Sequence, residues 1–334
     1  MTISELLREY KALGIGQQID YSKFYLYSII THSTAIEGST VTELENQLLF
    51  DEGITAKGKP LTEQMMNLDL KNAYEWGMET FSQHPAITID LLKTLSAKVM
   101  ARTGSEYKAL GGTFSSARGD LRLLNVTAGF GGRSYLNYTK VPQHLSDFCD
   151  EINKRRAQLD ANAPETVYEL SFWAHYHLVT IHPWADGNGR TSRLLMNLLQ
   201  MEYGVLPMKI YKEEKAEYIQ ALIDTREQED ESIFIKAMMQ LHTQHLQDEI
   251  TAFRTSMAGE LSEKNVRKEL SERQRYILSL IAADSRITTE QMSEKTGVNE
   301  KTVRRDLAIL QQQGIIERVG GRKLGQWMIK EGQV

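Results

Sequence analysis

The stretch "IHPWADGNGRTSR" at residues 181–193 limits the fold of this chain more than any other, because it contains the end of one helix and the start of the next. Pro183 cannot continue a helix, so the helical run "APETVYELSFWAHYHLVTI" must end at His182. Two glycines flank Asn188, and the apolar run "LLMNLLQM" follows. Glycines can turn successive N–H groups toward one point. The stretch therefore predicts an anion-binding turn at the N-terminus of a buried helix.

Two arginines open the second helix, although the helix dipole disfavours positive charge there by roughly 0.3–1 kcal/mol each. Arg190 and Arg193 are three residues apart and face the same side of the helix. A polyphosphate offsets their charge better than one carboxylate, which cannot accept so many donors. Asp186 beside a phosphate predicts a Mg²⁺ ion between them, and His182 can accept a proton from a hydroxyl that attacks phosphorus. These residues predict phosphoryl or nucleotidyl transfer to an alcohol.

The same residues have two simpler explanations. A polar loop with glycine caps and surface salt bridges would account for "GNG" alone, since short glycine motifs are weak signals, but His, Asp and two Arg beside it favour a site. A metal centre of His175, His177, His182 and Asp186 is disfavoured, because His177 points away from the helix face that His175 and His182 share. The chain has no GxxxxGK[ST] motif, which excludes an ordinary P-loop.

The sequence "HPWADGNGRTSR" resembles the signature of the Fic family, HxFx(D/E)GNGRxxR, over its whole length. Trp184 stands where the pattern has Phe; both fill an apolar pocket, so we expect altered packing and retained chemistry. The resemblance covers roughly residues 1–250 and implies a mainly α fold, with a Fic-type helical core and a β-hairpin flap. It also implies transfer of AMP from ATP to a Ser, Thr or Tyr hydroxyl of a target protein, with release of pyrophosphate.

The resemblance assigns a role to each residue of the signature. His182 would be the general base, and Asp186 would be the Mg²⁺ ligand. The α- and β-phosphates of ATP would bind to a backbone anion hole formed by Gly187, Asn188 and Gly189. Arg190 would help to hold the phosphates, and Arg193 would reach the γ-phosphate. Tyr218, in "KAEYIQAL", is placed like a residue near the adenine in relatives; an aromatic side chain on a helix face explains its position equally well.

A glycine-rich segment upstream of the signature predicts a β-hairpin. "GDLRLLNVTAGFGGRSYLNY" alternates around a "GFGG" centre. It resembles the flap with which Fic proteins clamp a target segment by strand addition. The flap residues on its first arm would be Arg122, Leu123, Leu124, Asn125 and Val126.

The segment "STAIEG" fits the pattern (S/T)xxxE(G/N) that is inhibitory in many Fic relatives. The residues that match it are Ser33, Glu37 and Gly38. The resemblance implies that Glu37 pairs with Arg193 and keeps the γ-phosphate from docking productively, because one guanidinium cannot make bidentate contacts to a carboxylate and a phosphate together. The alternative is that Glu37 only caps or decorates a helix end.

A chain of 334 residues with 41% hydrophobic and 25% charged residues has room for two or three domains. We expect an N-terminal helical region with the inhibitory motif at residues 1–81, a Fic catalytic domain at 82–258 and a winged-helix domain at 259–334. In the first region a helix should end near Gly38, a capping box of Thr40 and Glu43 should open the next, and another helix should cover residues 61–81. Cys149, the single cysteine, is given no role.

The last block carries two capping boxes, Ser271 with Gln274 and Thr288 with Gln291, and then a third helix opened by Asn299. A hairpin turning at Gly320 and Gly321 follows, so the block predicts a winged helix, a form of helix-turn-helix. From residue 261 onward 14 Lys and Arg face 10 Asp and Glu, within a chain of net charge −5. Lys301, Arg304 and Arg305 would lie on outer faces of the third helix. This pattern favours binding of DNA and contact with a protein equally.

No apolar run approaches the roughly 18 residues of a membrane span, and the N-terminus lacks the features of a secretory signal, so we expect a cytoplasmic protein that does not contact a membrane. Its oligomeric state stays open, a homodimer included. Two other functions compete with AMP transfer. The protein could remove AMP from a modified protein, with Glu37 positioning a water, or it could be a DNA-binding regulator whose Fic-like pocket senses a nucleotide. An intact His182 argues against the regulator, because sensing needs phosphate ligands but no base.

Overall fold

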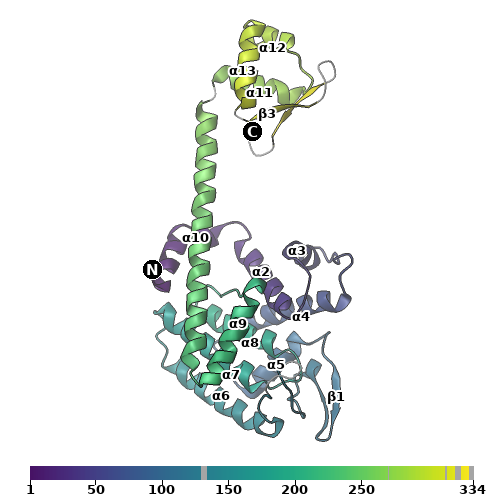
Figure 1. Ribbon diagram of the computed structural model, residues 1–334, viewed down its shortest axis with the longest axis vertical. Helices are drawn as coiled ribbons and strands as arrows, with labels where there is room; N and C mark the ends of the chain where they lie inside the picture. The colour runs from purple at the N-terminus through teal and green to yellow at the C-terminus, as the bar shows by residue number, and fades with distance from the viewer. Residues whose placement is uncertain (129–133, 270, 313, 320–324, 331–334) are drawn as a thin grey trace. The chain divides into compact units, whose positions relative to one another are not determined.

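The computed structural model describes residues 1–128, 134–269, 271–312, 314–319 and 325–330. The chain forms two compact units, Met1–Ile250 and Thr251–Val334, each with its own core (Figure 1). The first unit is almost entirely helical. Among the residues described, the second combines the end of a long helix that begins in the first unit with three further helices and a small sheet. The mainly α fold predicted from the sequence is confirmed.

Ten helices and one small sheet belong wholly or partly to the first unit, within the residues described. The helices are α1 (Ile3–Ala12), α2 (Tyr21–Ile36), α3 (Glu43–Asp51), α4 (Leu61–Phe81), α5 (Ile89–Val99), α6 (Val141–Ala157), α7 (Pro164–Ile181), α8 (Asn188–Glu202), α9 (Lys215–Gln228) and α10 (Glu231–Glu269), which continues into the second unit. Short 3₁₀ helices are η1 (Ile15–Gln17), η2 (Ser116–Arg118), η3 (Tyr138–Lys140) and η4 (Lys212–Glu214).

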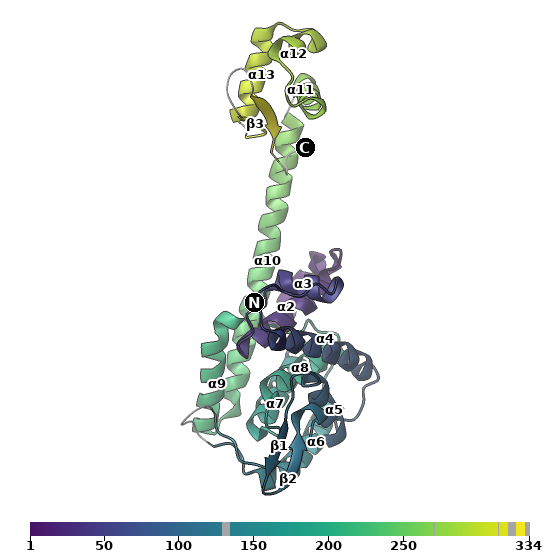
Figure 2. The ribbon, with the colours of Figure 1, turned by 90° about the vertical axis from the view of Figure 1, so that its right-hand side faces the viewer.

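Helices α7 and α8 form the centre of the first unit. They lie side by side, and α4, α5 and α6 pack around them (Figures 1 and 2). Four residues of α7 at three- and four-residue spacing are buried, Val167, Leu170, Ala174 and Leu178, and burial extends beyond them to Phe172. A helix that is apolar on nearly every face belongs in a core. The turn between α7 and α8 is therefore held by two helices that cannot shift independently of the core.

Helix α4 approaches α8 very closely at one point. A Cβ atom added at Gly77 would lie 2.6 Å from Cδ1 of Leu198, so any larger residue here would require the buried Leu198 side chain to shift. Helix α2 packs on α4 in turn. The expected boundary after residue 81 therefore does not separate two compact units, because α4 joins the N-terminal helices to the core. The boundary between the two compact units falls after Ile250, earlier than the expected domain boundary at residue 258.

The regular hairpin of the first unit is not where we predicted it. Strands β1 (Glu106–Ala109) and β2 (Gly112–Ser115) pair antiparallel before the predicted segment. In the predicted flap the arms do approach each other, through a bridge between Thr127 and Ser134, but residues 122–126 form no regular strand. The expected "GFGG" turn lies outside the described residues.

The predicted capping box of Thr40 and Glu43 is wrong. Thr42 is the N-cap of α3, and its partner is Glu45, whose carboxylate accepts the N–H of Thr42 at 2.8 Å. Thr40 instead donates both its N–H and its hydroxyl to Glu63 on α4, at 2.6 and 2.8 Å. The sequence pattern fits both registers, and the contact with α4 selects the later one.

The second unit has the predicted winged-helix elements. They are α11 (Glu272–Ala283), α12 (Thr289–Thr296), α13 (Glu300–Gln312) and the antiparallel strands β3 (Ile316–Val319) and β4 (Gln326–Ile329). Both predicted capping boxes, at Ser271 and Thr288, are confirmed, while the expected turn at Gly320 and Gly321 lies outside the described residues. The unit buries Val303, Leu307 and Leu310 of α13 and leaves the three basic residues of this helix exposed. In the described part of the chain, no helix has the length and apolar character needed to cross a membrane.

Candidate functional site

The prediction that two glycines shape the turn between α7 and α8 is only half confirmed: Gly187 has a positive φ, whereas Gly189 already belongs to α8. His182 caps the end of α7 in the left-handed region, with φ 53°, and Gly187 precedes α8 with φ 84°. A non-glycine residue in this region costs free energy and is often found at a functional site. The Asn188 side chain braces the turn: its oxygen accepts the N–H of Trp184 at 3.1 Å, and its nitrogen donates to the carbonyl of Trp184 at 2.8 Å.

Trp184 anchors the turn in the core. Its side chain is fully buried, and its indole N–H donates to the carbonyl of Gly119 at 3.1 Å, a bond that the Phe of the family signature could not form. On the other side of the turn, a Cβ atom added at Gly187 would lie 2.7 Å from Sδ of Met100. The turn is therefore held on both sides. Its φ favours glycine at position 187, and a larger residue would also require the Met100 side chain to shift.

The imidazole of His182 has the tautomer and the protonation state that a general base needs. Its Nδ1 lies 3.2 Å from the carbonyl oxygen of Val179, so Nδ1 carries the proton and Nε2 is left to accept one. Burial lowers the pKa of His182 to about 4. The ring is thus neutral at neutral pH, which is the form that can take a proton from an attacking hydroxyl.

The flap residue Arg122 is not available to a target protein. Its side chain is 1% exposed, and its guanidinium donates to backbone carbonyls of His182 (2.7 Å), Leu124 (2.8 Å) and Leu136. The N–H of Arg122 also donates to the carbonyl of Pro183 at 2.9 Å. Arg122 therefore joins the flap to the end of α7. These side-chain bonds hold the arm at residues 122–126, which forms no strand, against the end of α7.

The remaining predicted flap residues differ in exposure. Leu123, Leu124 and Val126 are partly buried, and Asn125 is exposed and accepts the N–H of Tyr138 at 3.0 Å. Val126 accepts the N–H of Tyr135 at 3.0 Å. Docking of a target segment on these four residues stays a prediction.

Arg190 is a buried cation with too few partners. It is 5% exposed, its Nη2 lies 3.5 Å from Asp186 and 3.2 Å from Sδ of Met100, and its Nε and Nη1 have no partner among the described contacts. Burial lowers the pKa of Arg190, and the charge of Asp186 opposes this shift. A buried donor without an acceptor is costly, so an anion bound here would stabilise the site.

Arg193 is also buried, but unlike Arg190 it donates several hydrogen bonds to acceptors within the chain. Its Nε donates to the Ser33 hydroxyl at 2.9 Å, and its Nη2 donates to the carbonyl of Ser33 at 2.9 Å and to Glu37 at 2.6 Å. The ion pair of Glu37 and Arg193 that the family resemblance implies is present. Gly38, with φ 103°, turns the chain directly after α2 and this carboxylate.

Glu37 lies at the N-terminus of α8, where an anion is expected. A Cβ atom added at Gly189 would be 2.5 Å from its Oε1. The first N–H groups of a helix have no partner inside the helix, so the position favours negative charge. Burial would raise the pKa of Glu37, but the charge of Arg193 and its hydrogen bond outweigh this effect, and the pKa is lowered. Glu37 is thus ionised and occupies part of the predicted phosphate cradle.

Asp186 is placed to hold a cation together with phosphate oxygens. Its side chain is 54% exposed, and its Oδ1 accepts the N–H of Gly187 at 2.6 Å. Within the described residues no three His, Cys, Asp or Glu side chains form a metal-binding group. One accessible carboxylate beside phosphate donors fits Mg²⁺, which commonly keeps water and takes substrate oxygens as ligands.

Tyr218 and the other two histidines of α7 pair with neighbouring side chains. Tyr218 is 3% exposed, and its hydroxyl lies 2.9 Å from Nε2 of His175, which is also buried. His177 pairs with Glu231 at 2.7 Å. The proximity of Tyr218 to an adenine stays a prediction.

One residue at the site had no signal in the sequence. The ring of Tyr135, on the second arm of the flap, stacks on the imidazole of His182, with ring centres 3.8 Å apart and 17° between the planes. Neither a motif nor periodicity marks this tyrosine.

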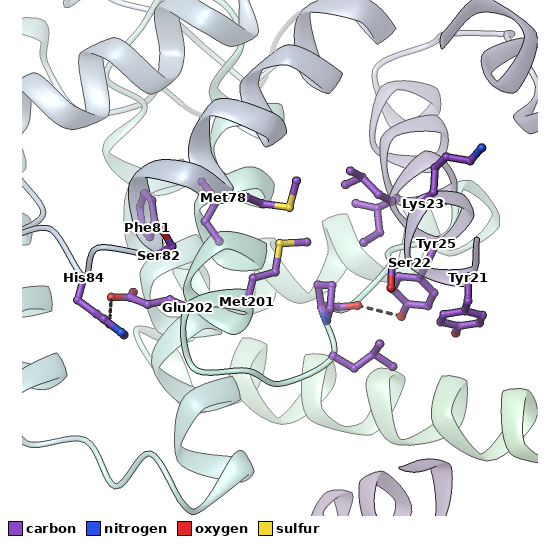
Figure 3. A pocket seen from close by; sticks show the side chains of 15 residues that line it. Tyr21, Ser22, Lys23, Tyr25, Met78, Phe81, Ser82, His84, Met201 and Glu202 are labelled. Carbon is purple, nitrogen blue, oxygen red and sulfur yellow. Dashed lines mark hydrogen bonds and ion pairs between the residues drawn. The ribbon is translucent and has the colours of Figure 1, made fainter. Parts of the chain in front are cut away.

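A separate cavity of about 680 Å³ lies at the other end of α8 (Figure 3). Its wall is largely apolar and includes Met78 and Met201. Two pairs of its polar groups are bonded to each other, Tyr25 to the carbonyl of Pro207 at 2.9 Å and His84 to Glu202 at 2.8 Å. No residue of the turn between α7 and α8 lines it. The cluster at the turn, with its under-paired cation, is therefore the better candidate for a nucleotide site.

Comparison with known families gives two matches on this chain. Residues 86–200 match the model of the Fic/DOC family, and residues 273–324 match that of the DeoR-like helix-turn-helix domain. The first match contains the turn between α7 and α8, and the second contains α11 to β3. The two matched segments do not overlap.

Curated relatives match about 60% of this chain. The protein adenylyltransferase fic-1 of Caenorhabditis elegans is 28% identical over 201 residues, which are 60% of this chain and 36% of the relative. The protein adenylyltransferase Fic of Nematostella vectensis is 31% identical over 196 residues, 58% of this chain and 42% of the relative. The chain thus spans well under half the length of these relatives.

Solved structures share the fold. A fragment of Fic-1 from C. elegans matches with a TM-score of 0.58 and 24% identity, covering 76% of this chain and 73% of that one. A Fic family protein from Desulfovibrio desulfuricans matches with a TM-score of 0.56 and 18% identity, covering 98% of this chain and 96% of that one. At these identities the likeness concerns the fold alone.

Proposed function

Because this chain contains a Fic domain followed by a DeoR-like helix-turn-helix domain, we propose that it is a protein adenylyltransferase that moves AMP from ATP to a hydroxyl side chain of a target protein. The observation that carries the proposal is that one turn holds the under-paired, buried guanidinium of Arg190 in the first turn of α8 and the neutral imidazole of His182 at the end of α7. A polyphosphate supplies the acceptors that Arg190 lacks, and an alcohol supplies the proton that the imidazole can take.

In the proposed reaction, Nε2 of His182 takes the proton of the target hydroxyl. The hydroxyl oxygen then forms a bond to the α-phosphorus of ATP, the bond from that phosphorus to the bridging oxygen breaks, and pyrophosphate leaves. The bond from Nδ1 of His182 to Val179 keeps the ring in the required tautomer. The buried carbonyl contacts of Arg122 hold the backbone of His182.

The phosphates would bind where the described donors converge. The first N–H groups of α8, at Asn188 and Gly189, and the guanidinium of Arg190 would bind the α- and β-phosphates, and Arg193 would bind the γ-phosphate. Asp186 would hold Mg²⁺, which offsets phosphate charge when bound. Tyr218 would lie near the adenine.

We propose further that Glu37 inhibits this reaction. Its carboxylate already occupies Arg193 and the space in front of Gly189. A γ-phosphate needs the same donors, and one guanidinium cannot satisfy both anions. ATP would then bind in a position that is unsuited to attack on the α-phosphorus, until α2 or the Glu37 side chain moves.

The test of AMP transfer is to incubate the purified Glu37→Gly chain and Mg²⁺ with a cell lysate and ATP labelled on the α-phosphate or on the γ-phosphate, beside the same lysate without the chain. We expect label in protein from the α position only, since a kinase would transfer the γ-phosphate. His182→Ala should abolish the label. Incorporation above that of the lysate alone that persists in His182→Ala, or that comes from the γ position, would reject the proposal, and release of AMP from labelled protein by the parent chain would favour AMP removal.

For the second unit we propose binding of duplex DNA through α13. The support is the DeoR-like match and the exposed Lys301, Arg304 and Arg305, of which Arg304 pairs with Glu300 at 2.6 Å. Fluorescence anisotropy with labelled duplex should show binding that weakens with salt and with the triple alanine variant. Absence of salt-dependent binding would assign the unit to protein contact instead.

A further inference from the structure

Tyr135 is the side chain that covers the imidazole of His182. The two rings are nearly parallel, 17° apart, with centres 3.8 Å from one another. The tyrosine is itself held: its N–H donates to the carbonyl of Val126 at 3.0 Å, and the guanidinium carbon of Arg226 on α9 lies 5.8 Å from its ring centre. The stack is thus supported by the flap and by α9, rather than by one flexible side chain.

Arg122 connects the same flap to the backbone of the base. The guanidinium of Arg122 donates to carbonyls on both arms of the flap, at Leu124 and Leu136, and to the carbonyl of His182. The described parts of the two flap arms are therefore joined to the end of α7 by one side chain. Arg122 fixes the main chain of His182, and Tyr135 lies against the plane of its side chain.

We propose that Tyr135 is a positioning residue for His182: its ring holds the imidazole in one plane and keeps water from that face, so that only the ring edge with Nε2 meets the acceptor hydroxyl. The kinetic consequence rests on the proposed AMP transfer, whereas the effect on the imidazole does not. The sequence of this flap arm would then influence the rate of transfer as well as the choice of target.

Several charged groups act on the imidazole besides the stack. Burial has the largest effect and lowers the pKa of His182; the Val179 carbonyl raises it, Arg122 on the flap lowers it, and Glu37 on α2 and Asp186 in the turn raise it. Removing the Tyr135 ring changes the burial and leaves these groups in place. The expected result is therefore a rise in pKa toward the ordinary histidine value of about 6.5.

The test uses the full chain with labelled histidines, followed by NMR titration. The His182 signal is assigned by its loss in His182→Ala. We expect its pKa to rise by one unit or more in Tyr135→Ala and to stay near that of the parent in Tyr135→Phe, which keeps the ring face. Tyr138→Ala is the matched control, a nearby flap tyrosine with no recorded ring contact to His182, and it should leave the pKa unchanged. If Tyr135→Ala does not fold, Tyr135→Leu takes its place.

The kinetic arm measures AMP transfer in a Glu37→Gly background. We expect Tyr135→Ala to lower kcat by tenfold or more with little change in the KM for ATP, and Tyr135→Phe to restore it. An unchanged His182 pKa in Tyr135→Ala, or an equal shift in Tyr138→Ala, overturns the inference. A shifted pKa without AMP transfer in any variant keeps the inference and rejects the proposed function.

Discussion

Arg190 and Arg193 begin the same helix, but the fold gives them opposite surroundings. Arg193 donates to Ser33 and Glu37, whereas Arg190 keeps two donor atoms without a partner among the described contacts. Both side chains are buried. One arginine is thus already paired with an anion inside the chain, and the other is left for an anion from outside.

Arg190→Met separates ligand binding from stability. We expect ATP affinity, measured by calorimetry, to fall by on the order of tenfold or more, because the main phosphate donor is gone. The free energy of unfolding should stay the same or rise by about 1 kcal/mol, because an under-paired buried cation is replaced by an apolar side chain of similar length.

Arg193→Met is the matched control for that prediction. It leaves Glu37 without its partner, so urea unfolding should show a loss of about 1–3 kcal/mol, less than for a fully buried pair because Glu37 is 35% exposed. If Arg190→Met destabilises the chain as much as Arg193→Met, the description of Arg190 as under-paired is incorrect.

Glu37→Gly should raise the initial rate of AMP transfer by on the order of tenfold or more, since Arg193 and the space before Gly189 become free for the γ-phosphate. Glu37→Gln should raise it less, because the amide still fills the space without the charge. Glu52→Gln, an exposed acidic residue after α3, serves as the control and should have no effect. Equal rates in Glu37→Gly and the parent would contradict the inhibitory role.

At the scale of elements, the site depends on how α8 is held. Its N-terminus carries the cradle, α7 supports it from one side, and α4 approaches it at Gly77 and Leu198. Helix α2 brings Ser33 and Glu37 to the same end of α8. A change in the distance between α4 and α8 should therefore be felt in the packing of the whole core.

Gly77→Ala tests this close approach. The added methyl group would lie 2.6 Å from Leu198, so we expect the free energy of unfolding to fall by about 1–3 kcal/mol. Leu198→Ala in the same chain makes room for that methyl group, so the two losses should sum to more than the loss in the double variant. Urea denaturation measures all three, and strictly additive losses would show that the two residues are not in contact.

At the scale of the whole molecule, buried histidines make stability depend on pH. Burial lowers the pKa of His175 and of His242 to about 3 and that of His182 to about 4. Below about pH 6.5 these histidines bind protons in the unfolded chain but stay neutral in the folded one. The free energy of unfolding therefore falls as the pH drops from about 6.5 toward 4, and these histidines do not affect it at higher pH. Carboxylates with lowered pKa values, such as Glu37, act only at lower pH.

We expect the free energy of unfolding to decrease by about 1 kcal/mol per buried histidine between pH 7.5 and pH 5.5, as measured by urea denaturation. His242 is a convenient probe, since it is 1% exposed, neither ring nitrogen has a partner among the described contacts, and its ring lies against Tyr168. His242→Phe should be more stable than the parent at pH 5.5 and less sensitive to pH. The same pH dependence in both chains would exclude a contribution from His242.

Local signals in the sequence determined the turn and most helices. Pro183, Gly187 and the arginines placed the end of α7 and the start of α8, and α4 begins and ends at the predicted residues. The capping boxes and apolar spacing of the second unit were equally readable. These features depend on residues a few positions apart, whose backbone preferences act within one turn of helix.

Only the tertiary structure decided the contacts between distant segments. It buried Arg122 against His182, placed Tyr135 on the imidazole, and drew Thr40 to Glu63 and so moved the cap of α3 to Thr42. The physical reason is that such contacts depend on which carbonyl, ring face or carboxylate the packed helices bring within reach. A hydrogen bond or a ring stack between segments leaves no periodic pattern in either of them.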